Sequence, residues 1–215
     1  MIGAPSGGKP GVAGLLLRAA GALRRGAAGL AALMAWAAGW NYLACALFVT
    51  ADILGRNLFG VSSAATVEVT GYMLACGIAW ALAHTLACRA HIRVDVLVNR
   101  LPPRWRAPLH LLALLLLAGF AGFIAWAGWM LWDESALFDA HDNSALRIPL
   151  VLPQGIWTVG LIAFALMCAV LLLEAGLALL LGEPRRLDAL LGSRSLQDET
   201  AEALQAVAMA KEERA

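Results

Sequence analysis

The sequence has few charged residues, and this scarcity narrows the classes of protein it can belong to. Of its 215 residues only 14% are charged and 61% are hydrophobic, and the formal net charge is +1. A soluble domain usually has about 25% charged and 45–50% apolar residues. Basic residues form no stripe outside the segments that flank the apolar blocks. The composition therefore excludes an ordinary soluble domain and indicates no nucleic-acid partner.

Residues that carry catalysis or redox chemistry are also scarce. The chain has no Cys-x-x-Cys motif, and none of its four cysteines lies in an expected outer loop, which argues against a disulfide-generating enzyme. These cysteines are predicted to pack as small residues; they are Cys45, Cys76, Cys88 and Cys168. Gly-rich phosphate loops, nucleophile elbows and metal-ligand clusters do not occur in the sequence. We therefore expect no catalytic residue, cofactor or metal site, and no enzyme activity.

What the chain does have is four long apolar blocks, at about 30–50, 67–88, 108–131 and 155–181. Each has the ~20 residues that a helix needs to cross ~30 Å of hydrocarbon. Each is continuous and rich in Leu and Ala, which is typical of a helix. The sequence thus predicts an all-α integral membrane protein with four transmembrane helices in residues 30–182.

Two segments flank this membrane domain. Residues 1–29 form a leader, whose stretch 11–28 mixes four leucines with three arginines, a pattern that suits a helix lying on an anionic membrane face. A flexible leader fits the same residues. Residues 183–215 form a charged tail, for which a weak amphipathic helix and disorder are both open.

The charges between the blocks predict an orientation. Positive residues flank blocks one, two and four on the same side, and these are Lys9, Arg18, Arg24, Arg25, Arg89, Arg93, Arg100, Arg104, Arg106, Arg185, Arg186 and Arg194. The third loop is instead acidic, with Asp133, Glu134, Asp139 and Asp142. Cytoplasmic loops carry the excess of Lys and Arg. Both termini and the second loop are therefore expected inside, and the first and third loops outside.

Glu174 lies within the fourth block, and an intramembrane acid is a candidate for ion or proton coupling. It also lies close enough to the inner end to reach the interface or to pair with Arg185 or Arg186. We favour this structural role. His84 and His110 are expected at similar depth on helices two and three, so they allow a second function, a stand-alone four-helix redox protein that binds b-type haem or quinone.

The third block carries small residues at helical spacing, namely Ala118, Ala121, Gly122 and Ala125. Such a stripe lets two helices approach closely. The partner of this stripe stays open at this point, since a helix of this chain and a helix of a second protein would fit it equally.

Several motifs occur in a fixed order. The first block is followed by Asp52-Ile-Leu-Gly-Arg56-Asn-Leu-Phe-Gly60, and Glu68 opens the second block ahead of Gly71-Tyr72. The second block ends in His91-Ile-Arg93-Val-Asp95-Val-Leu97, followed by Leu101-Pro102. Before the fourth block come Ser144-Ala-Leu-Arg-Ile-Pro149 and Pro153-Gln154. In this order the chain resembles the DctQ-type small permease subunit of tripartite ATP-independent periplasmic (TRAP) transporters. It departs from that family at Arg89-Ala90, where a glycine usually precedes the histidine.

The resemblance implies a non-enzymatic bracing subunit in the bacterial inner membrane. It implies two partners, a large multi-span subunit of DctM type and an extracytoplasmic solute-binding protein of DctP type, in a system for ion-coupled uptake of organic acids. Coupling is typically to Na⁺, with the ion site in the large subunit. On this interpretation Arg56 and Glu68 pair with each other or contact partners at the outer boundary. His91, Arg93 and Asp95 order the inner turn at the lipid headgroups. A purely structural role, capping helices and fixing depth, fits these residues equally.

Overall fold

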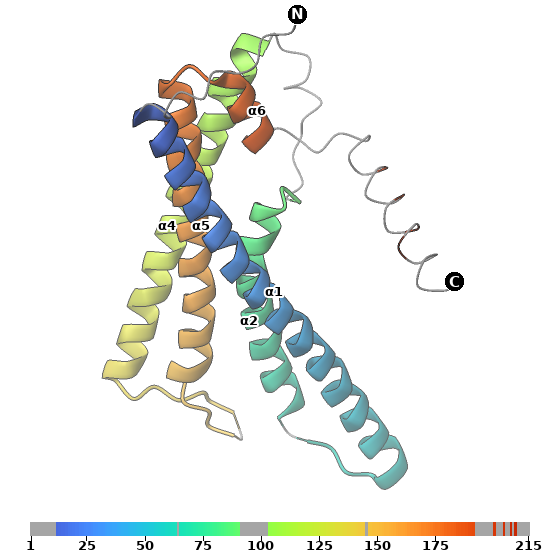
Figure 1. The fold of residues 1–215 in the computed structure, drawn as a ribbon. Helices are drawn as coiled ribbons and strands as arrows, with labels where there is room; N and C mark the ends of the chain where they lie inside the picture. The colour runs from blue at the N-terminus through green and yellow to red at the C-terminus, as the bar shows by residue number, and fades with distance from the viewer. Residues whose placement is uncertain are drawn as a thin grey trace, which may run out of the picture.

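A computed structural model describes residues 12–63, 65–90, 103–144 and 146–191, and the single positions 200, 204, 207 and 209. The helices of this part of the chain are α1 (Val12–Phe59), α2 (Thr66–Ala87), α4 (Pro103–Leu137), α5 (Val151–Leu180) and α6 (Pro184–Leu191). Four of them are long and apolar enough to cross a membrane (Figure 1). The predicted all-α fold with four spans is confirmed.

The first helix is much longer than the span predicted at 30–50. It runs without a break for 48 residues, which is about 72 Å at 1.5 Å per residue. The segment has no proline, and its many Ala, Leu and Arg residues are strong helix formers, so nothing ends the helix at the membrane boundary. Residues 12–29 are thus the first part of α1 and not a separate helix. Their placement on a membrane face stays a prediction.

The other spans agree with the predicted blocks to within a few residues, except that α4 begins at Pro103 and ends at Leu137. The C-terminal tail, residues 183–215, differs more from its prediction. Its first residues form α6, whose Leu187 and Leu191 are 0% and 2% exposed. Further along, at 196–207, a weak amphipathic helix and disorder were both open; only residues 200, 204 and 207 of this stretch are described, all of them helical.

Helix α5 is the centre of the bundle, because it packs against α1, α2, α4 and α6. Helix α1 crosses the others diagonally, so that its first half lies against α5 and its second half against α2 (Figure 1). The main core is built around Phe164, Met167, Cys168 and Leu171 of α5, together with Leu86 of α2. Helix α5 thereby joins α4 to the pair α1–α2.

Small residues set the closest helix approaches. A Cβ atom on Gly160 of α5 would lie 2.7 Å from the backbone carbon of Ala79 in α2, so only glycine fits there. The structure also shows what the stripe of small residues in the third block contacts. Ala121 and Ala125 are 0% and 8% exposed, and Ala121 lies in the core with residues of α5. Ala121 and Ala125 therefore pack within the chain, whereas Gly122 of the same stripe is exposed and a Cβ on it would meet nothing within 4 Å.

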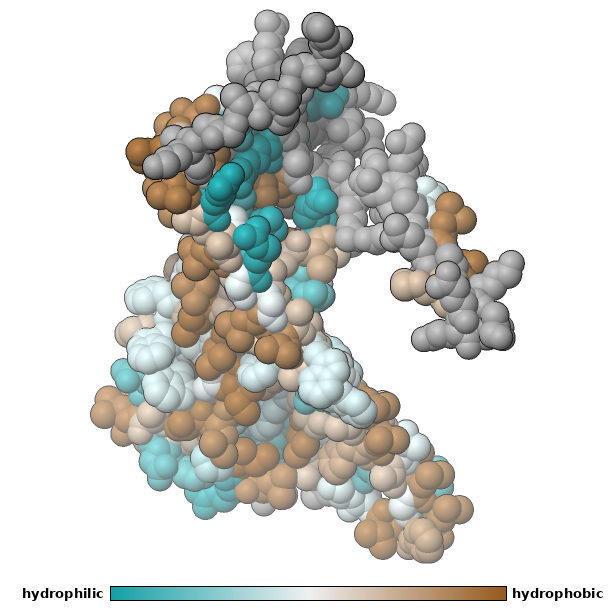
Figure 2. Space-filling view, in the orientation of Figure 1, coloured by the Kyte–Doolittle hydropathy of each residue, from teal (hydrophilic) through white to brown (hydrophobic). Residues whose placement is uncertain are grey.

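The outward-facing surface is largely apolar. Large side chains such as Trp36, Phe120 and Trp126 are 60% exposed or more. In Figure 2 hydrophobic residues cover much of the middle of the helices, and hydrophilic ones gather toward the ends. Lipid hydrocarbon satisfies such a surface, whereas water does not.

Candidate functional site

The polar residues of the described chain gather at the two ends of the bundle. We call the end with the α1–α2 turn and the loop 138–150 the carboxylate end, and the end with Arg24, Arg89 and Arg186 the arginine end. Of the six residues singled out by sequence, Arg56 and Glu68 lie at the carboxylate end and Glu174 at the arginine end, while His91, Arg93 and Asp95 fall outside the described residues.

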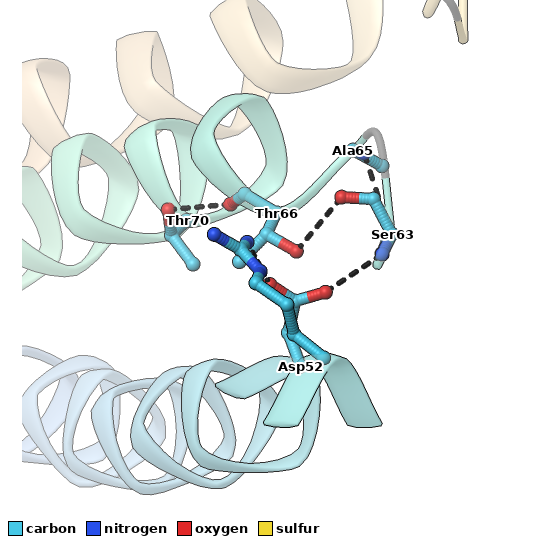
Figure 3. A network of polar contacts seen from close by, with 6 residues as sticks. Asp52, Ser63, Ala65, Thr66 and Thr70 are labelled. Carbon is cyan, nitrogen blue, oxygen red and sulfur yellow. Dashed lines mark hydrogen bonds and ion pairs between the residues drawn. The ribbon is translucent and has the colours of Figure 1, made fainter. Parts of the chain in front are cut away.

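At the carboxylate end, Asp52 organises the turn between α1 and α2. Its Oδ1 accepts a hydrogen bond from the backbone N–H of Ser63 over 2.7 Å, and its Oδ2 accepts one from Arg56 Nη2 over 2.8 Å. The Ser63 carbonyl in turn accepts from the Thr66 hydroxyl, and Thr70 bonds back to Thr66 (Figure 3). Asp52 is only 8% exposed, so these bonds compensate for burying its charge.

Arg56 therefore has a different partner from the one expected. Sequence reasoning offered Glu68 as its partner, whereas the structure pairs it with Asp52, one helical turn earlier. Arg56 remains 60% exposed on its side chain, so it can still contact another protein. Asp52 was part of the quoted motif but was not singled out, although an Asp and an Arg four residues apart on a helix are a recognisable pair.

Glu68 lies in a second cluster at the same end. Both of its carboxyl oxygens are buried, with no hydrogen-bond partner among the described residues. Its carboxyl group contacts Asp142, whose Oδ2 also accepts a hydrogen bond from the Tyr72 hydroxyl over 2.6 Å. This cluster fastens the loop 138–150 to α2.

The pKa of Asp142 is lowered by its partners. The hydrogen bond from Tyr72 is the largest cause, followed by the contact with Glu68, and burial opposes both. Asp142 was predicted only as one of several loop acids. Its link to Tyr72 spans 70 residues of sequence, so no local signal could have revealed it.

At the arginine end, Glu174 is 1% exposed and holds two arginines. Its Oε2 accepts from Arg24 Nε over 2.8 Å, and its Oε1 accepts from Arg186 Nη2 over 2.9 Å. The Arg186 guanidinium also donates to the carbonyl of Leu17 over 3.0 Å. One buried carboxylate thus joins α1, α5 and α6.

The contact between Glu174 and Arg186 was one of the expected alternatives, and the structure confirms it. The contact with Arg24 was missed, because it joins residues 150 positions apart. The network packs directly against α1 at Gly21, where a Cβ would lie 3.5 Å from both Glu174 and Arg186, an ordinary van der Waals contact. A carboxylate with two guanidinium partners is a stable ion network, which favours the structural role of Glu174 over ion coupling.

His91, Arg93 and Asp95 lie outside the described residues. The structure does show how α2 ends just before them. The N–H of Ala90 bonds to the Thr85 carbonyl and that of Arg89 to the Leu86 carbonyl, a Schellman arrangement. Arg89 takes the left-handed conformation at φ 55°.

The redox alternative rested on His84 and His110. The ring of His84 lies 3.5 Å from the sulfur of Cys88 on its own helix. Among the residues described, no three His, Cys, Asp or Glu side chains gather in a group that could hold a metal ion.

Comparison with known families decides between these alternatives. Residues 45–177, more than half of the chain, match the model of the family described as tripartite ATP-independent periplasmic transporters, DctQ component. The chain belongs to the DctQ family. No curated protein and no solved structure matches it.

Membership makes the chain the small subunit of a TRAP transporter and a multi-pass membrane protein. A DctQ component is part of a transporter and not an enzyme. The match covers Asp52, Arg56, Glu68, Tyr72, Asp142 and Glu174, so both polar clusters of the carboxylate end belong to the family domain. Arg24 and Arg186 lie outside it.

Proposed function

We propose that this DctQ subunit braces a large DctM-type transport subunit and helps to dock a DctP-type solute-binding protein, during ion-coupled uptake of organic acids. The family match carries the proposal. In this assignment the protein lies in the bacterial inner membrane, with the arginine end in the cytoplasm and the carboxylate end outside, as the distribution of positive charge favours.

The way the helices are joined supports a bracing role. A brace must resist shear between its helices, and polar clusters tie them at both ends: Asp52 holds the α1–α2 turn, and Glu174 joins α1, α5 and α6. The groove between α1, α2 and α5, of about 910 Å³, is lined by apolar residues such as Leu30, Met34 and Leu166. Such a lining suits lipid or another helix and not an organic acid.

The carboxylate end supplies candidate contacts for the binding protein. Asp133, Glu134 and Asp139 are exposed at the end of α4 and in the loop that follows it, the loop that also carries Asp142. We assign these acids to docking, and any Na⁺ site of the system to the large subunit. The substrate is then chosen by the binding protein.

Co-purification tests the assembly. A tagged chain expressed with its candidate partners should bring down a large multi-span protein, and its repeated failure to do so would reject the proposal. Glu68→Lys should then reduce solute uptake while the subunit stays in the membrane. Glu183→Lys is the matched control, because Glu183 is an exposed acid at the opposite end. Unchanged uptake by Glu68→Lys would show that Glu68 is not at an interface.

A further inference from the structure

The groove of about 910 Å³ lies along α1, where this helix crosses from α5 to α2 (Figure 1). A second cavity of about 190 Å³ continues it, since Trp80 lines both. We call the two cavities together the α1 groove. The α1 residues that line it extend from Ala22 to Asn41, which is about 29 Å at 1.5 Å per residue. This length matches the ~30 Å hydrocarbon core of a bilayer.

The lining of the α1 groove is almost wholly apolar and comes from three helices. Its large side chains stand exposed, as Leu33 of α1 and Leu166 of α5 show with 66% and 60% exposure. Between them lie small residues, among them Gly26 of α1, Ala83 of α2 and Ala163 of α5. Small residues let two helix backbones approach closely. The groove therefore has the length and the lining of a site for one more membrane-spanning helix.

One polar side chain, Asn41, lines the groove within the apolar block 30–50, and it indicates what covers this face. Its Nδ2 donates to the Met73 carbonyl over 2.6 Å, whereas no described residue donates to its Oδ1. A polar group without a partner is costly in hydrocarbon, and acyl chains carry no hydrogen-bond donor. A neighbouring helix supplies such a donor from a side chain, as helices in membranes commonly do. Asn41 therefore favours protein over lipid as the occupant.

We propose that the α1 groove receives one transmembrane helix of the large subunit, and that this helix presents a hydroxyl or amide donor to Oδ1 of Asn41. The inference rests on the proposed function and names the face of this chain that does the bracing. A helix in the groove contacts α1 and α5 and lies over α2. It is thereby held by three spans at once, at the place where α5 joins them.

Two glycines of α1 give a matched test. Gly26 lines the groove and Gly39 lies outside it; both are exposed, and a Cβ on either would meet nothing within 4 Å. The chain is co-expressed with its DctM-type subunit, and the complex is purified in a mild detergent. Gly26→Leu should reduce recovery of the large subunit roughly tenfold or more, because its side chain occupies the space of the incoming helix. Gly39→Leu should recover as much as the unaltered chain.

A second pair of variants tests the polar contact. Asn41→Leu should weaken the complex roughly three- to tenfold, the range expected for one hydrogen bond between helices in a membrane. Asn57→Leu is the control, because Asn57 is an exposed asparagine of the same helix outside the groove. Thermal midpoints of the isolated variants are measured alongside, since Asn41 also holds the Met73 carbonyl. Gly26→Leu removes no hydrogen bond, so its midpoint should not fall.

The outcomes separate this inference from the proposed function. Equal recovery of the large subunit by Gly26→Leu and by the unaltered chain would overturn the assignment of the groove and leave the bracing role standing. An equal loss in Gly39→Leu would overturn it as well. Loss of co-purified phospholipid from Gly26→Leu, with the large subunit still recovered, would assign the groove to lipid instead. If the unaltered chain recovers no large subunit, the proposed function itself is rejected.

Discussion

Arg186 donates a hydrogen bond from Nη2 to Oε1 of Glu174 over 2.9 Å, and by this bond the tail helix α6 is joined to the membrane domain. Glu174 is buried between α1 and α5, where an unpaired charge would be very costly. The first part of α1 and the start of the tail thus depend on a carboxylate supplied by the fourth span.

Removing that carboxylate should be strongly destabilising. Glu174→Ala removes the charge-assisted hydrogen bonds to Arg24 and Arg186, whose side chains are 32% and 33% exposed, and each such bond is worth about 1.5–3 kcal/mol. We expect the midpoint of thermal unfolding in detergent to fall well below that of the unaltered chain. Glu183→Ala, which removes an exposed acid, should have little effect. Similar midpoints for both variants would show that the ion network adds no stability.

The approach of α2 to α5 at Gly160 should tolerate no side chain. A methyl group there would meet the backbone of Ala79, and overpacking of this kind costs about 1–3 kcal/mol. Gly160→Ala should therefore lower the unfolding midpoint. Gly176→Ala in the same helix is the control, since a Cβ there meets nothing within 4 Å. That change should be neutral or slightly stabilising, because Ala is the better helix former.

Asp52 should matter more than its partner Arg56. Asp52→Ala leaves the α1–α2 turn without the acceptor for the Ser63 N–H, whereas Arg56→Gln removes only a largely exposed ion-pair partner. We expect the aspartate variant to show faster amide hydrogen exchange across residues 60–66, and the arginine variant to resemble the unaltered chain. The reverse order would mean that the ion pair, and not the backbone bond, holds the turn.

The contact between Tyr72 and Asp142 should make stability depend on pH. A carboxyl whose pKa is lower in the folded state adds stability above its unfolded pKa of about 3.9 and loses it as the pH falls through the folded pKa. Tyr72→Phe should therefore lower the unfolding midpoint near pH 7 and have less effect near pH 3. Titration of a ¹³C-labelled Asp142 should show its pKa rising toward the ordinary value in the variant. A difference between the chains that is independent of pH would contradict this account.

Much of this protein could be predicted from its sequence, because the membrane imposes simple rules. Apolar runs of about 20 residues must be helices in hydrocarbon, so the four spans followed directly from composition. The motif order from Asp52 to Gln154 indicated the DctQ family, and the family match confirms it. The position of Glu174 near the end of the fourth span made contact with Arg186 one of the expected alternatives, and the structure shows that contact.

Only the tertiary structure decided which residues meet across the bundle. The partners Arg24 and Glu174, and likewise Tyr72 and Asp142, are far apart in sequence, and their contact depends on the crossing of α1 and on the fold of the loop 138–150. The length of α1 was also missed, because hydrophobicity marks where a helix is buried in lipid and not where it ends. Sequence determined which segments enter the membrane, since that depends on each segment's own composition. Packing determined the polar clusters, since each needs several segments at once.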